Sequence, residues 1–196
     1  MKKRQFLTAA AIGATALPAF SFARKPVKPD SGPALLTLSG AITKANRGPL
    51  DPALDQMMHK QEVKFDKAHA FDFAEITALP AISIKPTLEY DAKPHVLSGP
   101  LLVDVVSAAG WKGADATKLL LRAVDGYAVA ISLADARKYR FIVATHLDGQ
   151  PMPLGGLGPL WAVYDADRFS EMAAKPLNER FALCPWALYH VDVQSI

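Results

Sequence analysis

The five histidines are the first side chains to test for metal or acid–base chemistry in this 196-residue chain: His59, His69, His95, His146 and His190. No two of them have helical i, i+4 spacing and no His-x-His occurs, so the pattern does not indicate a zinc site. His95 follows a turn residue, Pro94, and His146 precedes the turn-forming Asp148-Gly149. Because the rims of binding pockets are commonly built from such turns, we predict His95 and His146 as binding residues, with a surface or structural role as the alternative.

A glycine-rich segment is the second candidate. Gly155-Gly156-Leu157-Gly158 can present consecutive backbone N–H groups to an anion such as a phosphate. It is not a P-loop, because no Gly-Lys-Ser/Thr follows it. It is not a dinucleotide fingerprint either, because no strand–turn–helix unit surrounds it. We predict Gly156 and Gly158 as binding positions, with a flexible turn as the alternative.

Two aspartates and a tyrosine form a third group. Asp125-Gly126 separates the apolar runs Leu119–Val124 and Tyr127–Ile131, which predicts a hairpin with a two-residue turn and positive φ at both turn positions. Asp135 follows Ser132 by three residues, the spacing of a helix cap. A turn and a cap are therefore the roles that local sequence alone predicts for Asp125 and Asp135.

Nucleophilic chemistry has little support. The single cysteine, Cys184, excludes an internal disulfide, and its apolar surroundings in Leu183-Cys184-Pro185-Trp186 favour a small buried hydrophobe. No serine lies in a nucleophile-elbow sequence, and no spacing indicates a Ser–His–Asp arrangement or a pair of glycosidase carboxylates.

Three short helices are expected to position these residues. Asp72-Phe73-Ala74-Glu75 has capping-box spacing and begins a helix that Pro80 ends. Ser98-Gly99-Pro100 is predicted to open a second helix, with one apolar face, that Gly110 closes. Ser132–Tyr139 is the third.

Strands dominate the rest of the chain. The predicted strands are Leu35–Leu38, Ile82–Leu88, Leu119–Val124, Tyr127–Ile131, Arg140–Thr145, Leu160–Tyr164 and Trp186–Val193. Short helices scattered among many strands predict an α+β fold with a mixed β-sheet rather than a regular βαβ alternation.

Several of these segments, in this order, resemble a known family. They are Leu36–Gly40, Phe71–Pro80, Leu97–Val106, Leu121–Ile131, Ala144–Pro153, Gly158–Tyr164 and Trp186–Val193. Together they resemble the oxidoreductase molybdopterin-binding domain of the sulfite-oxidase fold, and most of all its short exported bacterial members. The resemblance covers residues from about Leu35 to Val193.

The resemblance implies a molybdopterin-type cofactor and a set of positions around it: His95, Asp125, Tyr127, Asp135, His146, Gly156 and Gly158. It also implies a cysteine thiolate on molybdenum, supplied just after the strand at Ile82–Leu88. No cysteine lies there: Thr87 offers a neutral hydroxyl and Glu89 a hard carboxylate. We do not transfer the ligand role to the distant Cys184, so no metal ligand is assigned and tightly bound molybdenum is not expected.

The N-terminus predicts export. Lys2, Lys3 and Arg4 precede an uncharged apolar stretch that ends in Ser21-Phe22-Ala23, so residues 1–23 are predicted to be a cleaved signal peptide. Lys3-Arg4-Gln5-Phe6-Leu7 resembles a twin-arginine (Tat) signal, with a Sec signal as the alternative. Residues 24–34 are expected to be a linker, residues 35–196 the domain, and the periplasm the location.

The net charge of the chain bears on which classes of partner it can bind. The net charge of +3 comes from the three basic residues of the predicted signal peptide, so the remaining chain is neutral. The pI of 8.9 therefore does not indicate nucleic-acid binding.

Two functions stay open. One is a redox protein of the molybdopterin-binding oxidoreductase family, acting by oxygen-atom or electron transfer. The other is a non-catalytic periplasmic binding or accessory module, with a small molecule, or a membrane cytochrome or sensor, as partner.

Overall fold

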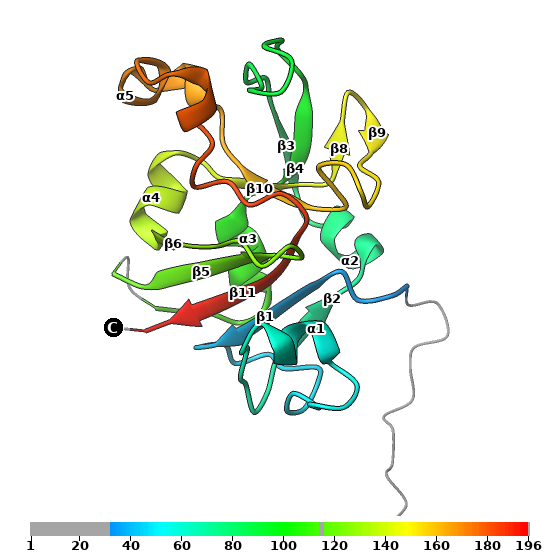
Figure 1. Cartoon of the computed structure of the whole chain (residues 1–196). Coiled ribbons are helices and arrows are strands. Elements are labelled where there is room, and N and C mark those ends of the chain that lie inside the picture. The colour runs from blue at the N-terminus through cyan, green and yellow to red at the C-terminus, as the bar shows by residue number, and fades with distance from the viewer. Residues whose placement is uncertain (1–31, 114–115, 196) are drawn as a thin grey trace, which may run out of the picture.

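A mixed five-stranded sheet forms one half of the molecule in the computed structural model, which describes residues 32–113 and 116–195 (Figure 1). Its order is β2-β1-β11-β5-β6. β1 and β11 are parallel, and the other neighbours are antiparallel. The bounds are β1 (Leu36–Gly40), β2 (His69–Phe71), β5 (Lys118–Ala123), β6 (Ala128–Ser132) and β11 (Leu188–Gln194).

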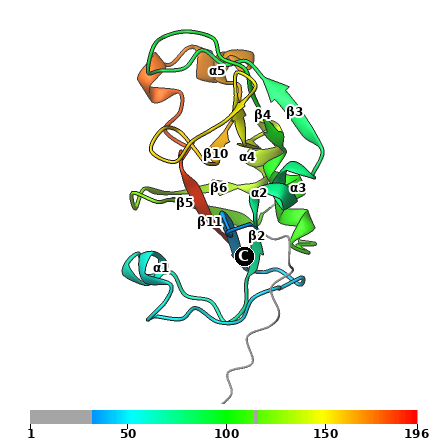
Figure 2. The ribbon, with the colours of Figure 1, turned by 90° about the vertical axis from the view of Figure 1, so that its right-hand side faces the viewer.

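A second sheet has the order β3-β4-β8-β9, and β7 pairs with β10 in a two-stranded ribbon. The bounds are β3 (Ala81–Ile84), β4 (Leu97–Pro100), β7 (Ile142–Ala144), β8 (His146–Leu147), β9 (Gln150–Pro151) and β10 (Trp161–Val163). Figure 2 shows these strands at the opposite end of the molecule from α1 (Gln56–Lys60). The α+β class with a mixed sheet is confirmed.

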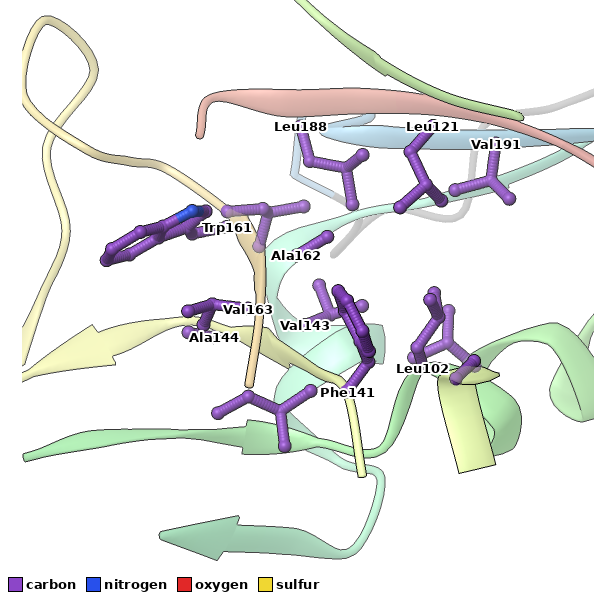
Figure 3. Close-up of a cluster of buried hydrophobic side chains, with 14 of the residues drawn as sticks. Leu102, Leu121, Phe141, Val143, Ala144, Trp161, Ala162, Val163, Leu188 and Val191 are labelled. Carbon is purple, nitrogen blue, oxygen red and sulfur yellow. The ribbon is translucent and has the colours of Figure 1, made fainter. Parts of the chain in front are cut away.

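The core lies between the larger sheet and the β7–β10 ribbon. Leu121, Leu188 and Val191 of the larger sheet point toward the ribbon, which contributes Val143 and Ala162 (Figure 3). All five side chains have no exposed surface. The residues of β7 and β10 are buried throughout, whereas β5 alternates between buried and more exposed residues, as a strand with one face on the core does.

Two predicted helices form as expected. In α2 (Phe73–Thr77) the Asp72 carboxylate accepts from the Glu75 amide at 2.8 Å, and Glu75 accepts from the Asp72 amide at 3.1 Å. In α4 (Leu133–Lys138) the Ser132 hydroxyl oxygen accepts from the Asp135 amide at 2.9 Å. Both helices therefore begin at the cap that the sequence indicates.

The predicted start of the remaining helix was wrong. Ser98 to Pro100 belong to β4, where Ser98 faces Ser83 of β3 on one side and His146 of β8 on the other. The helix, α3, is Leu102–Ala108, and Gly110 ends it with φ +86°. Pro100 is tolerated at the end of the strand, because proline needs no ladder hydrogen bond there.

The predicted hairpin forms, but its two-residue turn was wrong. Four residues, Val124 to Tyr127, lie between β5 and β6. The Ala123 amide donates to the Tyr127 carbonyl at 2.8 Å, which closes a hairpin loop of three residues, Val124 to Gly126. Only Gly126 has positive φ, +94°. One left-handed residue is what a three-residue hairpin link requires.

The other predicted strands are present with shifted ends, and β3 is shorter than predicted because it stops before Pro86. The remaining helical segments are η1 (Ala166–Arg168), α5 (Ser170–Ala173) and η2 (Leu177–Glu179). Residues 1–31, which contain the predicted signal peptide and most of the linker, lie outside the described residues. Within 32–113 and 116–195, no helix has the length and apolarity to span a membrane.

Candidate functional site

A cleft beside Cys184 collects more of the predicted binding residues than any other place in the described structure. Two adjoining cavities, of about 240 and 630 Å³, share Tyr90 and Trp186 as lining residues. The smaller is also lined by Glu89, Ala123, Asp125, Tyr127, Asn178, Phe181, Ala182, Cys184 and Pro185. The larger is also lined by Val124, Leu154, Gly155, Gly156, Leu157 and Ala187. We call the combined space the cleft.

The connection between β3 and β4 supplies one wall of the cleft. Hydrogen bonds to two aspartates that do not line the cleft hold this connection in place. The carboxylate of Asp165 accepts from the Lys85 amide at 3.2 Å, and that of Asp167 accepts from the Thr87 amide at 2.7 Å. Asp167 is in turn paired with Arg180 at 2.9 Å. These bonds hold the segment that carries Glu89 and Tyr90.

The hairpin link and the glycine loop form the other walls. The Val124 amide donates to the Ala187 carbonyl at 3.1 Å, and the Ala187 amide donates to the Leu157 carbonyl at 3.1 Å. The Tyr127 hydroxyl donates to the Ala182 carbonyl. Three segments that are distant in sequence are thereby joined around the entry to β11.

Negative charge and aromatic rings characterise the cleft. Among the described residues, Glu89 and Asp125 are the charged residues that line it, and none of the lining residues is Lys, Arg or His. Partial burial, and then the neighbouring Glu89, raise the pKa of Tyr90 to about 12, so its phenol stays neutral at physiological pH. Tyr90 and Tyr127 are 57% and 46% exposed. Aromatic faces at the rim of an acidic cavity suit a ligand with an apolar body and positive charge.

Cys184 is the only sulfur that lines the cleft. It is buried, and its backbone carbonyl accepts from the Trp161 indole at 2.9 Å. Burial raises the pKa of its thiol far above the usual range, and Glu89 acts in the same direction. Without a metal ion, the side chain is therefore a neutral thiol at physiological pH.

Three of the seven predicted binding residues, Asp125, Tyr127 and Gly156, line the cleft. The Gly156 amide already donates to the Pro153 carbonyl at 3.3 Å, as in an ordinary turn. Gly158 packs against Met152, where a larger side chain would clash with that residue's backbone. Gly158 therefore shapes the loop and does not line the cleft.

The remaining three predicted binding residues, His95, His146 and Asp135, lie outside the cleft. His95 is held between two carboxylates, with Nδ1 2.7 Å from Asp148 and Nε2 3.0 Å from Asp91. The hydrogen bond that His95 donates to Asp148, and then the one to Asp91, raise the pKa of His95. His146 lines a separate cavity of about 280 Å³, and Asp135 serves in the cap of α4.

The sequence did not indicate Tyr90, Asn178, Phe181 or Trp186 as cleft residues. Tyr90, Phe181 and Trp186 come from irregular segments and Asn178 from the short helix η2, where no periodicity marks which side chains face a cavity. For the three aromatic residues, ring content was the one available signal, and it equally fits a core. In the described ranges no group of three or more His, Cys, Asp or Glu is arranged to hold a metal ion.

No protein-family model and no curated protein sequence matches the chain. A solved structure does: the crystal structure of the sulfane dehydrogenase SoxCD from Paracoccus pantotrophus, with a TM-score of 0.51 and 10% sequence identity. The similarity covers 81% of this chain. The chain has the sulfite-oxidase fold. It spans only 37% of the SoxCD chain, and at this identity the similarity concerns the fold alone.

The cleft residues fit a molybdopterin-type cofactor poorly, although the fold resembles a molybdopterin-binding domain. Such a cofactor carries a phosphate and a metal centre that a thiolate completes. The lining residues offer two carboxylates and no cation, and Cys184 offers a neutral thiol. Placing anionic groups beside these carboxylates is unfavourable. We therefore derive no chemical step through this cofactor.

Proposed function

We propose that the protein is a non-catalytic, exported binding module of the sulfite-oxidase fold, whose cleft takes a cationic organic molecule with an aromatic or apolar body. The observation that carries the proposal is the lining itself: Glu89 and Asp125 supply negative charge, and no lining residue supplies positive charge.

The aromatic side chains that line the cleft indicate which uncharged part the ligand has. Tyr90 and Trp186 lie where the two cavities meet, and Tyr127 and Phe181 line the smaller one. An ammonium group over an aromatic face gains on the order of 1 kcal/mol, and more where water is excluded. A flat apolar body can lie in the larger cavity, which Leu154 and Leu157 line.

Paired ligands of opposite charge test this proposal. Tryptamine and indole-3-propionate share an indole ring but carry an ammonium and a carboxylate. We expect saturable binding of tryptamine by isothermal titration calorimetry and at least about tenfold weaker binding of indole-3-propionate, a difference of about 1.4 kcal/mol.

Variants then locate the binding. Asp125→Asn removes the charge but can still accept from the Tyr127 amide, a bond of 2.9 Å in the structure. We expect it to weaken tryptamine binding several-fold. Asp66→Asn, on an exposed residue that is not among the lining residues of the cleft, is the matched control and should bind normally. Equal affinity for both ligands, or equal loss in both variants, would sink the proposal.

A molybdenum enzyme is the second candidate, and one placement favours it. Cys184 and Glu89 line the same cavity, although 94 residues separate them in the sequence. A thiol from the entry to β11 thus lies beside the segment where the family resemblance implies a cysteine. Deprotonation on metal binding would be needed to overcome the raised pKa of this thiol.

Elemental analysis separates the two candidates. We expect less than stoichiometric molybdenum in protein purified after export, for both the natural chain and Cys184→Ser. Near-stoichiometric molybdenum that is lost in Cys184→Ser would instead identify Cys184 as the ligand and establish the enzyme.

A further inference from the structure

A pocket separate from the cleft lies between the end of α4, η1 and the end of β3. It has a volume of about 200 Å³ and shares no lining residue with the cleft. Its lining residues are Ile84, Lys138, Tyr139, Arg140, Asp165, Arg168 and Phe169. We call it the Asp165 pocket. Its volume is several times the roughly 30 Å³ share of one water molecule, so it has room for a small organic molecule.

A buried oxygen without a partner marks this pocket. Asp165 is 8% exposed, and its Oδ2 atom accepts from the Lys85 amide at 3.2 Å. Its Oδ1 atom is buried and has no hydrogen-bond partner among the described residues. Because buried polar atoms are almost always paired, the Asp165 carboxylate has hydrogen-bonding capacity that the described residues do not fill.

The pocket also carries positive charge. Arg140 and Arg168 are exposed, and no ion pair of either side chain is found within residues 32–113 and 116–195. Lys138 is already paired with Glu171 at 2.8 Å. Two available guanidinium groups suit a carboxylate, which arginine can bind with two parallel hydrogen bonds. They also make a bare metal cation an unfavourable occupant.

The position of Arg140 has an energetic disadvantage for the fold. It follows the last turn of α4 with φ +54°, in the left-handed region where glycine is favoured. The Arg140 amide donates to the Arg137 carbonyl at 3.1 Å and the Phe141 amide to the Ala136 carbonyl at 3.0 Å, the arrangement in which glycine usually occupies this position. Folding alone therefore favours glycine at position 140.

We propose that the Asp165 pocket binds a free α-amino acid with an apolar side chain. The ammonium group donates to the Asp165 carboxylate, the ligand carboxylate pairs with Arg140 and Arg168, and the ligand side chain packs against Ile84, Tyr139 and Phe169. Each polar feature of the pocket then has one complementary group on a single small zwitterion.

Three ligands test the chemistry on the purified full-length protein. L-Leucine carries both charges, leucinamide lacks the carboxylate, and 4-methylpentanoate lacks the amine. We expect saturable binding of L-leucine by calorimetry, with a rise in melting temperature. Each analogue should bind at least about tenfold more weakly. Absence of L-leucine binding, or equal binding of either analogue, overturns the proposal.

Variants test the location, and one of them separates binding from folding. Arg140→Gly should raise the melting temperature of the ligand-free protein, because glycine adopts positive φ without strain, yet weaken L-leucine binding. Asp165→Asn, which can still accept from the Lys85 amide, should abolish binding. Lys60→Ala, on α1 at the other end of the molecule, should leave binding unchanged (Figure 2).

L-Leucine binding that survives Arg140→Gly and Asp165→Asn would overturn the assignment. The pocket and the cleft share no lining residue, but Asp165 also holds the β3–β4 wall of the cleft through the Lys85 amide. Tryptamine binding measured in the same variants therefore distinguishes loss of the Asp165 pocket from a disturbed cleft.

Discussion

Among single residues, Cys184 and Glu89 bear most directly on function. A soft thiolate is what a molybdenum centre of this fold would need, whereas the cleft holds a buried neutral thiol beside a carboxylate. Burial alone accounts for most of the raised pKa of Cys184, and Glu89 adds to it. The chemistry of these two side chains therefore favours organic cations over an anionic metal cofactor.

His190 makes the fold sensitive to acid. It is buried, with Nε2 3.0 Å from the Ser39 hydroxyl, and burial, then Arg122, lower its pKa to about 4. The unfolded chain binds a proton near the ordinary pKa of about 6.5, so it takes up the proton first as the pH falls. We therefore expect the free energy of unfolding to decrease between about pH 6.5 and 4, by on the order of 3 kcal/mol in total.

Urea denaturation at a series of pH values measures this loss. His190→Gln should flatten the pH dependence across that window, even if the variant is less stable throughout. His95→Gln is the control, because the pKa of His95 is raised and its contribution has the opposite sign: it is present at low pH and lost as the pH rises. An unchanged slope in His190→Gln would assign the acid sensitivity to other groups.

Among the elements, the link between β5 and β6 depends on Gly126. Its φ is +94°, and no atom lies within 4 Å of the position that a Cβ would occupy. Gly126→Val should therefore destabilise the protein through backbone strain alone, by about 1 kcal/mol or more. Gly48→Ala, where a Cβ is equally unobstructed and φ is not in the left-handed range, is the control and should stay within about 0.5 kcal/mol in denaturant unfolding.

Local signals explain which elements the sequence predicts correctly. The caps at Asp72 and Ser132 act over three residues, so both appear in the structure as expected. Ser98-Gly99-Pro100 has an equally local helix signal, but pairing with β3 and β8 makes it a strand. That pairing depends on residues up to about 50 positions away, which a local pattern does not contain.

The candidate site was predictable only in part for the same reason. Asp125 and Tyr127 could be predicted because the hairpin and the family resemblance both point to them. Tyr90 and Trp186 meet in the cleft only after β11 has joined the sheet, and nothing in their neighbouring residues indicates this meeting. His95 was also predicted as a binding residue, and in the structure it bridges two carboxylates outside the cleft.

For the whole molecule, export remains a prediction that a single measurement can check. We expect the protein recovered from the periplasm to have the intact mass of residues 24–196, because the small residues Ser21 and Ala23 form the cleavage signal. A recovered species that retains residues 1–23 would contradict cleavage at this site. A chain with Lys2, Lys3 and Arg4 replaced by uncharged residues should stay in the cytoplasm.

The parallel pair β1–β11 also sets the order in which the molecule can assemble during synthesis. β11 lies between β1 and β5, in the interior of the larger sheet, yet it is made about 150 residues after β1. While the ribosome is still elongating, β1 and β5 have no strand between them, and the apolar residues that β11 covers stay accessible to chaperones. Domains usually fold as units once their segments are available, so this domain acquires its sheet only after translation of β11. For the predicted export, this interval means that the chain is still unfolded while its N-terminus is already available for recognition.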